Sequence, residues 1–202
     1  SANSGTLILD ATCAPQNIKY PQDIELLNET REKLEEMICR LSDENGFYRP
    51  RMYREKARKD YLALAKCRKR SAKNIRKAIK KQLQYIRRDL GYIDNLIENN
   101  GVELRKSDAE LLDILMTVYE QQQYMYENKT HTVNDRIVSI SQPYIRPIVR
   151  GKAKSPVEFG AKLDLSVDET GMCRLEKLSF NAYNESEVLK SAIENYKKRT
   201  GH

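Results

Sequence analysis

The residue best placed to do chemistry is Asp10, a carboxylate that directly follows the short apolar run at residues 6–9. The run is rich in aliphatic and β-branched side chains, so it predicts a buried strand with Asp10 at its C-terminal edge. Carboxylate oxygens on a rigid support suit Mg²⁺, and two such ions can clamp the attacking and leaving oxygens of a phosphodiester displacement. On spacing alone, however, the favoured interpretation is that Asp10 caps the loop that follows.

The second chemical feature is a dense block of positive charge between Arg49 and Arg88. This block holds 17 Lys and Arg residues against two acidic residues, a net charge of +15, whereas the whole chain carries +7. Such a block repels itself unless a polyanion neutralises it. Nucleic acid is the commonest such polyanion, because its neutralised phosphates release counterions. A solvated helix face without a ligand is the alternative interpretation.

A basic helical hairpin is expected to carry most of this charge. Apolar residues recur in alternating steps of four and three, which predicts a long helix over about residues 55–98. A turn at residues 99–101 and the capping-box spacing of Ser107 and Glu110 predict a second, antiparallel helix over residues 107–127. The cations expected to contact DNA phosphates are Arg68, Lys69, Arg70, Lys73, Arg76, Lys77, Lys80 and Lys81. Such contacts position DNA without reading its sequence.

Three tyrosines interleave with these charges, namely Tyr53, Tyr61 and Tyr85. They could stack or bond phosphate, although partly buried helix residues are the favoured interpretation. The apolar seam of the hairpin could also recruit a partner or a second copy of the chain, which would make the protein a homodimer.

The remaining sequence predicts a helix, a loop and a strand. The helix is expected over about residues 21–41, before a turn cluster at residues 42–46. Residues 128–150 show little periodicity and contain two prolines, so we expect an extended loop with one short strand at residues 137–140. Strict alternation then predicts a strand over residues 157–167 with its apolar face buried.

A β-hairpin and a final helix close the pattern. A turn follows the long strand, and residues 173–182 form the return strand, in which the alternation changes parity near Glu176 and predicts a β-bulge. The cap spacing of Asn184 and Glu187 predicts a last helix over about residues 185–199. The order is therefore strand, helical insertion, strand, strand, helix.

Several motifs together resemble the catalytic domain of bacterial insertion-sequence DDE transposases. They lie at residues 7–12, 127–131, 135–138, 142–152, 159–163 and 178–186. The resemblance spans nearly the whole chain and implies an α+β chain with a partial RNase H-like fold, a three-stranded antiparallel sheet plus a helix. Residues 1–20 and 128–202 would form this core, and residues 21–127 would form a long helical insertion between the first two strands.

The resemblance also implies an activity. In such enzymes two Asp and one Glu bind two Mg²⁺ ions, water attacks a phosphodiester at the element's end, and the freed 3′-hydroxyl attacks target DNA. Asp10 matches the first Asp, with Mg²⁺ or Mn²⁺ as the metal of the complete enzyme. The second Asp and the Glu would follow His202, so we expect a truncated piece that is inactive alone, cannot assemble a complete two-metal site and need not hold a metal.

Other carboxylates of the chain could supplement the site. Asp164 stands where many relatives have a His, and Glu185 and Glu187 open the last helix. A solvated strand residue and helix caps are the favoured interpretation of these three side chains.

A second, smaller basic group is expected beside the strand that pairs with the strand of Asp10. It comprises Arg146, Arg150, Lys152 and Lys154, which could guide the scissile DNA strand toward the metal. The expected partner is DNA, both transposon ends and target. No apolar run approaches a membrane span, and the four scattered cysteines indicate a reducing cytoplasm. The resemblance implies a bacterial, nucleoid-associated protein. A non-enzymatic nucleic-acid-binding hairpin protein and a helical interaction module remain open as other classes.

Overall fold

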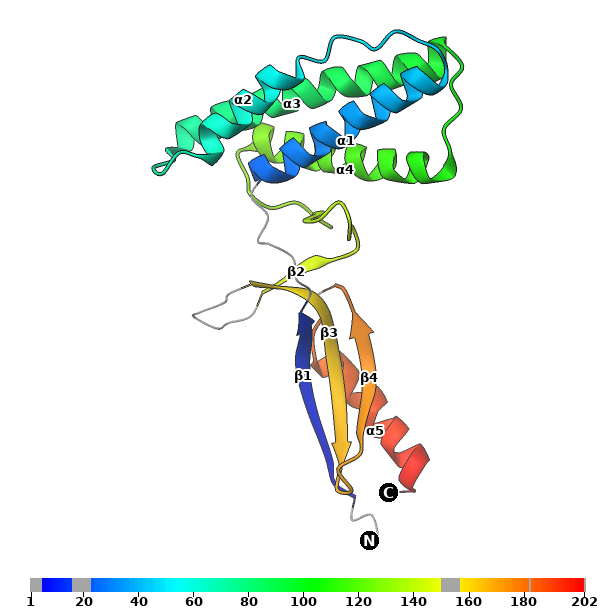
Figure 1. Cartoon of the computed structure of the whole chain (residues 1–202). Helices are drawn as coiled ribbons and strands as arrows, with labels where there is room; N and C mark the ends of the chain where they lie inside the picture. Colours follow the sequence, from blue (N-terminus) through cyan, green and yellow to red (C-terminus); the bar gives the residue numbers. More distant parts are fainter. Residues whose placement is uncertain (1–4, 16–22, 150–156, 182, 202) are drawn as a thin grey trace. The chain divides into compact units, whose positions relative to one another are not determined.

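The structure, a computed structural model, describes residues 5–15, 23–149, 157–181 and 183–201. They show an α+β chain with five α-helices and a four-stranded antiparallel sheet (Figure 1), so the predicted class is confirmed in this coarse form. The chain divides into two compact units: a helical unit, Tyr20–Pro143, and a sheet unit, Ser1–Lys19 with Tyr144–His202.

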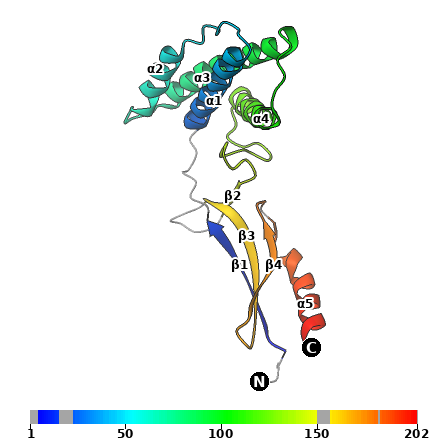
Figure 2. The ribbon, with the colours of Figure 1, turned by 45° about the vertical axis from the view of Figure 1, so that its right-hand side comes forward.

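The helical unit contains four α-helices and one π-helical turn. These are α1 (Asp23–Glu44), α2 (Arg54–Ala65), α3 (Ala72–Asp94), η1 (Asn95–Asn99) and α4 (Lys106–Asn128). Helix α1 packs against α3 and α4, and the two views in Figures 1 and 2 show these three helices side by side. Their apolar stripes meet in one core in which Leu34, Ile86 and Leu115 are fully buried. The seam predicted on α3 is therefore buried within the chain itself.

The predicted single helix over residues 55–98 is wrong, because the chain reverses between α2 and α3. The Ser71 hydroxyl accepts a hydrogen bond of 3.2 Å from the Asn74 backbone N–H and so caps the start of α3. At the other end of the break, the Arg70 guanidinium donates to the Ala65 carbonyl oxygen over 2.8 Å. These two local bonds satisfy helix ends that a continuous helix would not have.

Two further local predictions are wrong. Helix α4 begins at Lys106 with Arg105 in the N-cap position, so Ser107 lies inside the first turn and forms no capping box. Residues 137–140 form no strand, and two isoleucines of this segment join the helical core instead. Burial of apolar side chains, not strand pairing, explains the β-like composition of this segment.

The sheet unit is built around one long strand. Its elements are β1 (Leu7–Pro15), β2 (Arg146–Val149), β3 (Val157–Asp168), β4 (Cys173–Ser179) and the helix α5 (Ser186–Thr200). Strand β1 pairs along one edge of β3, while β2 and β4 pair with successive parts of the other edge, all antiparallel. The sheet thus has four strands and not the three expected. The predicted bulge at Glu176 is confirmed, because Asp164 pairs with Lys177 whereas Leu165 pairs with Leu175.

The sheet buries its polar face. Asp164, Ser166 and Asp168 alternate along β3 and are all buried, whereas the apolar residues between them are only half-buried. On the apolar face, Ile8 is 61% exposed and Leu175 is 55% exposed. The prediction that the apolar face of this strand is buried therefore holds for Phe159 and Ala161 and is wrong for the part of the strand from Leu163 on.

Helix α5 explains part of this inversion, because its Arg199 supplies a partner for a carboxylate on the polar face. Glu176 at the bulge accepts hydrogen bonds from Ser166 of β3 over 2.7 Å and from Arg199 of α5 over 3.1 Å. Asp168 pairs with Arg174 over 2.7 Å. Buried polar groups remain tolerable where each has a partner of this kind.

Charged side chains are also buried inside the helical unit. Arg31 and Glu35, both 1% exposed, form a 2.6 Å ion pair within α1. Arg54 donates to the same Glu35 carboxylate over 3.2 Å. On α3, Arg88 donates to Asp89 over 2.6 and 2.9 Å. Burial raises the pKa of the Asp89 carboxyl to about 7, although the hydrogen bonds and charge of Arg88 act in the opposite direction.

Asp89 predicts a pH dependence of stability. Between the ordinary carboxyl value of 3.8 and about 7, the folded protein holds a proton that the unfolded chain has released, so the free energy of unfolding falls as the pH rises. We expect Asp89→Asn to flatten this fall, as measured by urea denaturation at intervals between pH 4 and pH 8.

Asp43→Asn is the matched control. The hydrogen bond from Arg49 lowers the pKa of this exposed carboxyl, so it titrates below the tested range and its removal should leave the slope unchanged. An Asp89→Asn variant with the slope of the parent protein would contradict the assignment.

Candidate nucleic-acid interface

One face of α3 carries a straight row of cations. Lys73, Lys77, Lys80 and Arg87 follow one another at spacings of three, four or seven residues, with Gln84 completing the row, so all five lie on one side of the helix. All five are exposed, and within the described part of the chain none of these side chains has a hydrogen-bond or ion-pair partner. At ~1.5 Å per residue, the row from its first to its last member is about 21 Å long.

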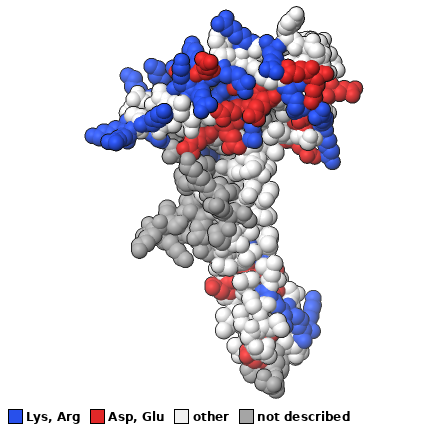
Figure 3. All heavy atoms as spheres, in the orientation of Figure 1, with Lys and Arg blue, Asp and Glu red and all other residues white. Residues whose placement is uncertain are grey.

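The eight hairpin cations predicted as DNA contacts fall into two groups. Arg68, Lys69, Lys73, Lys77 and Lys80 are exposed, and none of them has a side-chain partner among the residues that the structure describes. Figure 3 shows Lys and Arg gathered over the end of the helical unit where α2 meets α3. The three of these cations that lie on α3, Lys73, Lys77 and Lys80, together with Arg87 are called the α3 stripe below.

The other three predicted cations are held by the protein itself. Arg70 donates to the backbone carbonyls at the end of α2. Arg76 donates to the Tyr126 carbonyl oxygen over 2.8 Å and lies 4.0 Å from the centre of the same tyrosine's ring, so it joins α3 to α4. Lys81 forms a 2.6 Å ion pair with Asp60 of α2.

Asp60 is one of two acidic residues in the basic block, and its carboxylate is already paired with Lys81. Burial opposes its ionisation, but hydrogen bonds from Lys81 and Tyr85 outweigh burial and lower the pKa of the Asp60 carboxyl. Burial, followed by the bond to Asp60, raises the pKa of the Tyr85 hydroxyl to about 12. This acid therefore neutralises a cation between α2 and α3 and leaves the α3 stripe uncompensated.

Sequence reasoning missed several exposed cations of the same block. Arg87 was not predicted, although it continues the row on α3 by one further step of the helical period. On α2, Arg58 and Lys59 are exposed, and Lys66 is exposed just after its last residue. Lys59 and Lys66 stand seven residues apart and Lys66 stands seven residues before Lys73, so the helical period of the sequence could have found these two.

Of the second predicted basic group, one residue lies within the described part of the chain. Arg146 begins β2, pairs opposite Gly160 of β3 and is half-buried. Arg150, Lys152 and Lys154 lie outside the described residues. The structure therefore neither gathers nor separates this group.

Asp10 lies in the middle of β1, because the strand continues to Pro15, so its predicted position at the strand's end is wrong. Its partner on β3 is Leu165, whereas the next residue, Ala11, pairs with Asp164. Neighbouring strand positions point to opposite faces, so Asp10 is exposed on the apolar face and Asp164 is buried on the polar face. Across the described ranges, no three His, Cys, Asp or Glu side chains are grouped as a metal-binding set.

The other carboxylates left open by the sequence have distinct surroundings. Asp164 is 5% exposed, so the interpretation of a solvated strand residue is wrong. Glu185 forms a 3.0 Å ion pair with Lys162, and Glu187 lies exposed in the first turn of α5. The Asn184 side chain accepts a hydrogen bond from the Ser186 backbone N–H over 3.1 Å, but Glu185 and not Asn184 holds the N-cap position of this helix.

None of the described helices combines the length and the apolar character that crossing a bilayer requires. Comparison of the chain with protein-family models, with curated proteins and with solved structures gives no match. The assignment of a function therefore depends on the chain's own motifs and geometry.

Proposed function

We propose that this protein binds DNA through the α3 stripe, as part of a DDE-type transposase that cleaves and joins DNA strands. The observation that carries the proposal is the α3 stripe itself: exposed cations that follow one helix face and have no ion-pair partner in the described chain. Solvated helix faces usually mix the two signs of charge.

The geometry of the stripe fits a phosphate backbone. B-DNA carries closely spaced phosphates along each strand, and a row of about 21 Å can follow several of them. The Lys and Arg side chains of the stripe project from α3, and the apolar face of α3 packs against α1. Their spacing is therefore set before DNA binds. Contacts of this type supply affinity and orientation and would carry no sequence specificity.

The catalytic part of the proposal concerns the sheet unit. Strands β1, β3 and β4 pair antiparallel in this order and are followed by α5, which is the order that the transposase resemblance implies. Asp10 offers exposed oxygen ligands to Mg²⁺ or Mn²⁺, and a complete site needs further carboxylates. A bound ion would supply Lewis-acid activation of a phosphodiester. Transposon ends and target DNA are the proposed substrates.

A second candidate function is non-enzymatic nucleic-acid binding. The observation that favours it is that Asp10 and Asp164 point to opposite faces of the sheet. These two carboxylates therefore do not share one site. In that case the α3 stripe would keep its role and the sheet unit would be a scaffold.

Neutralising the α3 stripe should weaken DNA binding and its dependence on salt. We expect the triple variant Lys73→Gln/Lys77→Gln/Lys80→Gln to reduce the slope of log affinity against log salt concentration by about three, because each phosphate that the protein no longer neutralises lowers the slope by about one. Fluorescence anisotropy with a 20-base-pair duplex at several salt concentrations measures both the affinity and the slope.

The matched control removes the same amount of charge elsewhere. Lys190, Lys197 and Lys198 are exposed on α5, and their replacement by Gln should leave most of the slope in place. Equal losses in the two triple variants would show that net charge, and not the α3 stripe, determines binding.

The metal assignment predicts that Mn²⁺ binds near Asp10. Paramagnetic broadening of backbone NMR signals should centre on residues 8–12 and on the paired part of β3, and Asp10→Asn should abolish it because the carboxylate ligand is removed. Glu187→Gln, at the exposed start of α5, serves as the control. Broadening that survives Asp10→Asn, or that centres on α5, would refute the assignment.

A further inference from the structure

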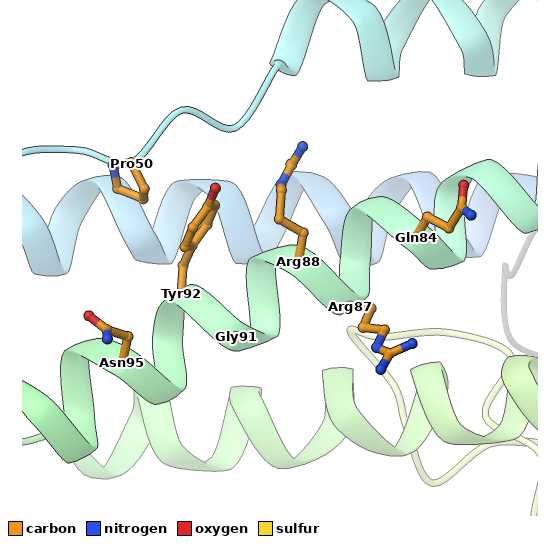
Figure 4. A pocket seen from close by; sticks show the side chains of 7 residues that line it. All are labelled: Pro50, Gln84, Arg87, Arg88, Gly91, Tyr92 and Asn95. Atoms are coloured by element: carbon orange, nitrogen blue, oxygen red, sulfur yellow. The ribbon is translucent and has the colours of Figure 1, made fainter.

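A pocket opens on the helical unit beside the far end of the α3 stripe. It has a volume of about 770 Å³ and lies between α3 and the segment that precedes α2, lined by Pro50, Gln84, Arg87, Arg88, Tyr92 and the bare backbone of Gly91, with Asn95 at one end (Figure 4). This volume is within the range of roughly 300–1,000 Å³ that small ligands and cofactors occupy in proteins.

The pocket has a rigid aromatic and cationic side. Figure 4 shows Tyr92 and Arg88 projecting the same way from α3 toward the segment of Pro50. The Arg88 guanidinium is fixed by Asp89 and lies 6.0 Å from the ring centres of both Tyr92 and Tyr53. Tyr85 adds a third ring at 5.4 Å. Aromatic rings and guanidinium planes held in this way are the surfaces on which proteins stack unpaired bases.

Tyr53 is held in a strained backbone conformation at the edge of this cluster. Its φ of 53° and ψ of 37° place it in the left-handed region, which a bulky side chain rarely adopts. The ring is nevertheless 49% exposed, and the Arg51 guanidinium lies 4.7 Å from its centre. Strain that persists at an exposed aromatic residue is typical of ligand-binding positions.

The opposite side of the pocket offers hydrogen-bonding groups that the protein does not use. Among the described residues, the side chains of Gln84, Arg87 and Asn95 have no hydrogen-bond or ion-pair partner. Gly91 lies between them, and a Cβ at this position would meet nothing within 4 Å. Glycine weakens the middle of a helix, and here it leaves the helix surface flat and open toward a ligand.

We propose that this pocket receives one unpaired nucleobase from a DNA strand that the α3 stripe holds. The inference rests on the proposed function and specifies the form of the DNA, a duplex with a single-stranded end. Gln84 and Arg87 belong both to the row of exposed residues on α3 and to the pocket lining, so a strand that follows the row arrives at the pocket. The base stacks on Tyr92 beside Pro50, Arg87 meets its phosphate, and the amides of Gln84 and Asn95 face the base edge.

The test compares three DNA probes with the full 202-residue chain: a blunt 20-base-pair duplex, the same duplex with a three-nucleotide 3′ overhang, and a single strand alone. We expect the parent protein to bind the overhang duplex about tenfold more tightly than the blunt one, as one stacked base provides. The base analogue 2-aminopurine in the overhang should lose fluorescence on binding, because stacking on tyrosine quenches it.

Tyr92→Leu should remove the preference for the overhang and the quenching while leaving blunt-duplex affinity unchanged. Tyr53→Asn is a second variant, because asparagine tolerates the left-handed conformation and an effect on binding is then not due to reduced stability. Tyr48→Leu is the matched control, since the side chain of Tyr48 is fully exposed, at 102%.

The outcomes separate this inference from the proposed function. Equal binding of blunt and overhang duplexes by the parent protein, or an overhang preference that survives both Tyr92→Leu and Tyr53→Asn, would overturn the base pocket and leave the α3 stripe intact. Failure to bind the blunt duplex, combined with Tyr92-dependent binding of the single strand, would overturn the duplex-binding α3 stripe and support the pocket.

Discussion

The packing and the charged surface of the helical unit depend on which of its cations pair with buried or half-buried carboxylates and which are exposed without a partner. Three buried or half-buried carboxylates, Glu35, Asp60 and Asp89, each form an ion pair with a cation of the same unit. Burying one of these charges without its partner would cost several kcal/mol, so these pairs fix how α1, α2 and α3 lie against one another. The cations of the α3 stripe have no such partner among the described residues and are exposed.

This division explains which cations the sequence could identify as ligand-binding and which it could not. The density of Lys and Arg located the basic block correctly. It could not show that the partners of Lys81 and Arg76 would be Asp60 and Tyr126, which lie 21 and 50 residues away. Only the folded contacts distinguish a cation that is already neutralised from one that is available.

The fold was predictable where a pattern is long and local. Alternation over β3 and β4 predicted the hairpin and its bulge, and helical periodicity predicted α1 and α5. The break between α2 and α3 was missed because one capping hydroxyl at Ser71 decides it, while the apolar pattern on either side is compatible with one helix. The buried polar face of the sheet was missed because its stability depends on partners on the bulge and on α5, such as Glu176 and Arg199.

The candidate site was predictable to the same extent, because local patterns identified residues whereas contacts between distant segments decided where they lie. Asp10 was identified by its type and its strand, but its position in the middle of β1 follows from pairing with β3 that continues to Pro15. The pocket at Tyr92 could not be predicted, because it lies between α3 and a segment about 40 residues earlier in the chain, where the Tyr92 hydroxyl donates to the Arg51 carbonyl oxygen.

The α3 stripe has opposite effects on the free and the bound protein. In the free protein its cations repel one another across one helix face, which lowers stability at low ionic strength. A polyanion removes this repulsion and gains the attraction of the same charges, and it does so only with the folded protein, in which the cations are aligned. Glu35, Asp60 and Asp89 pair with other cations, so the interactions that hold the helices together leave the cations of the stripe unpaired and able to attract a phosphate backbone.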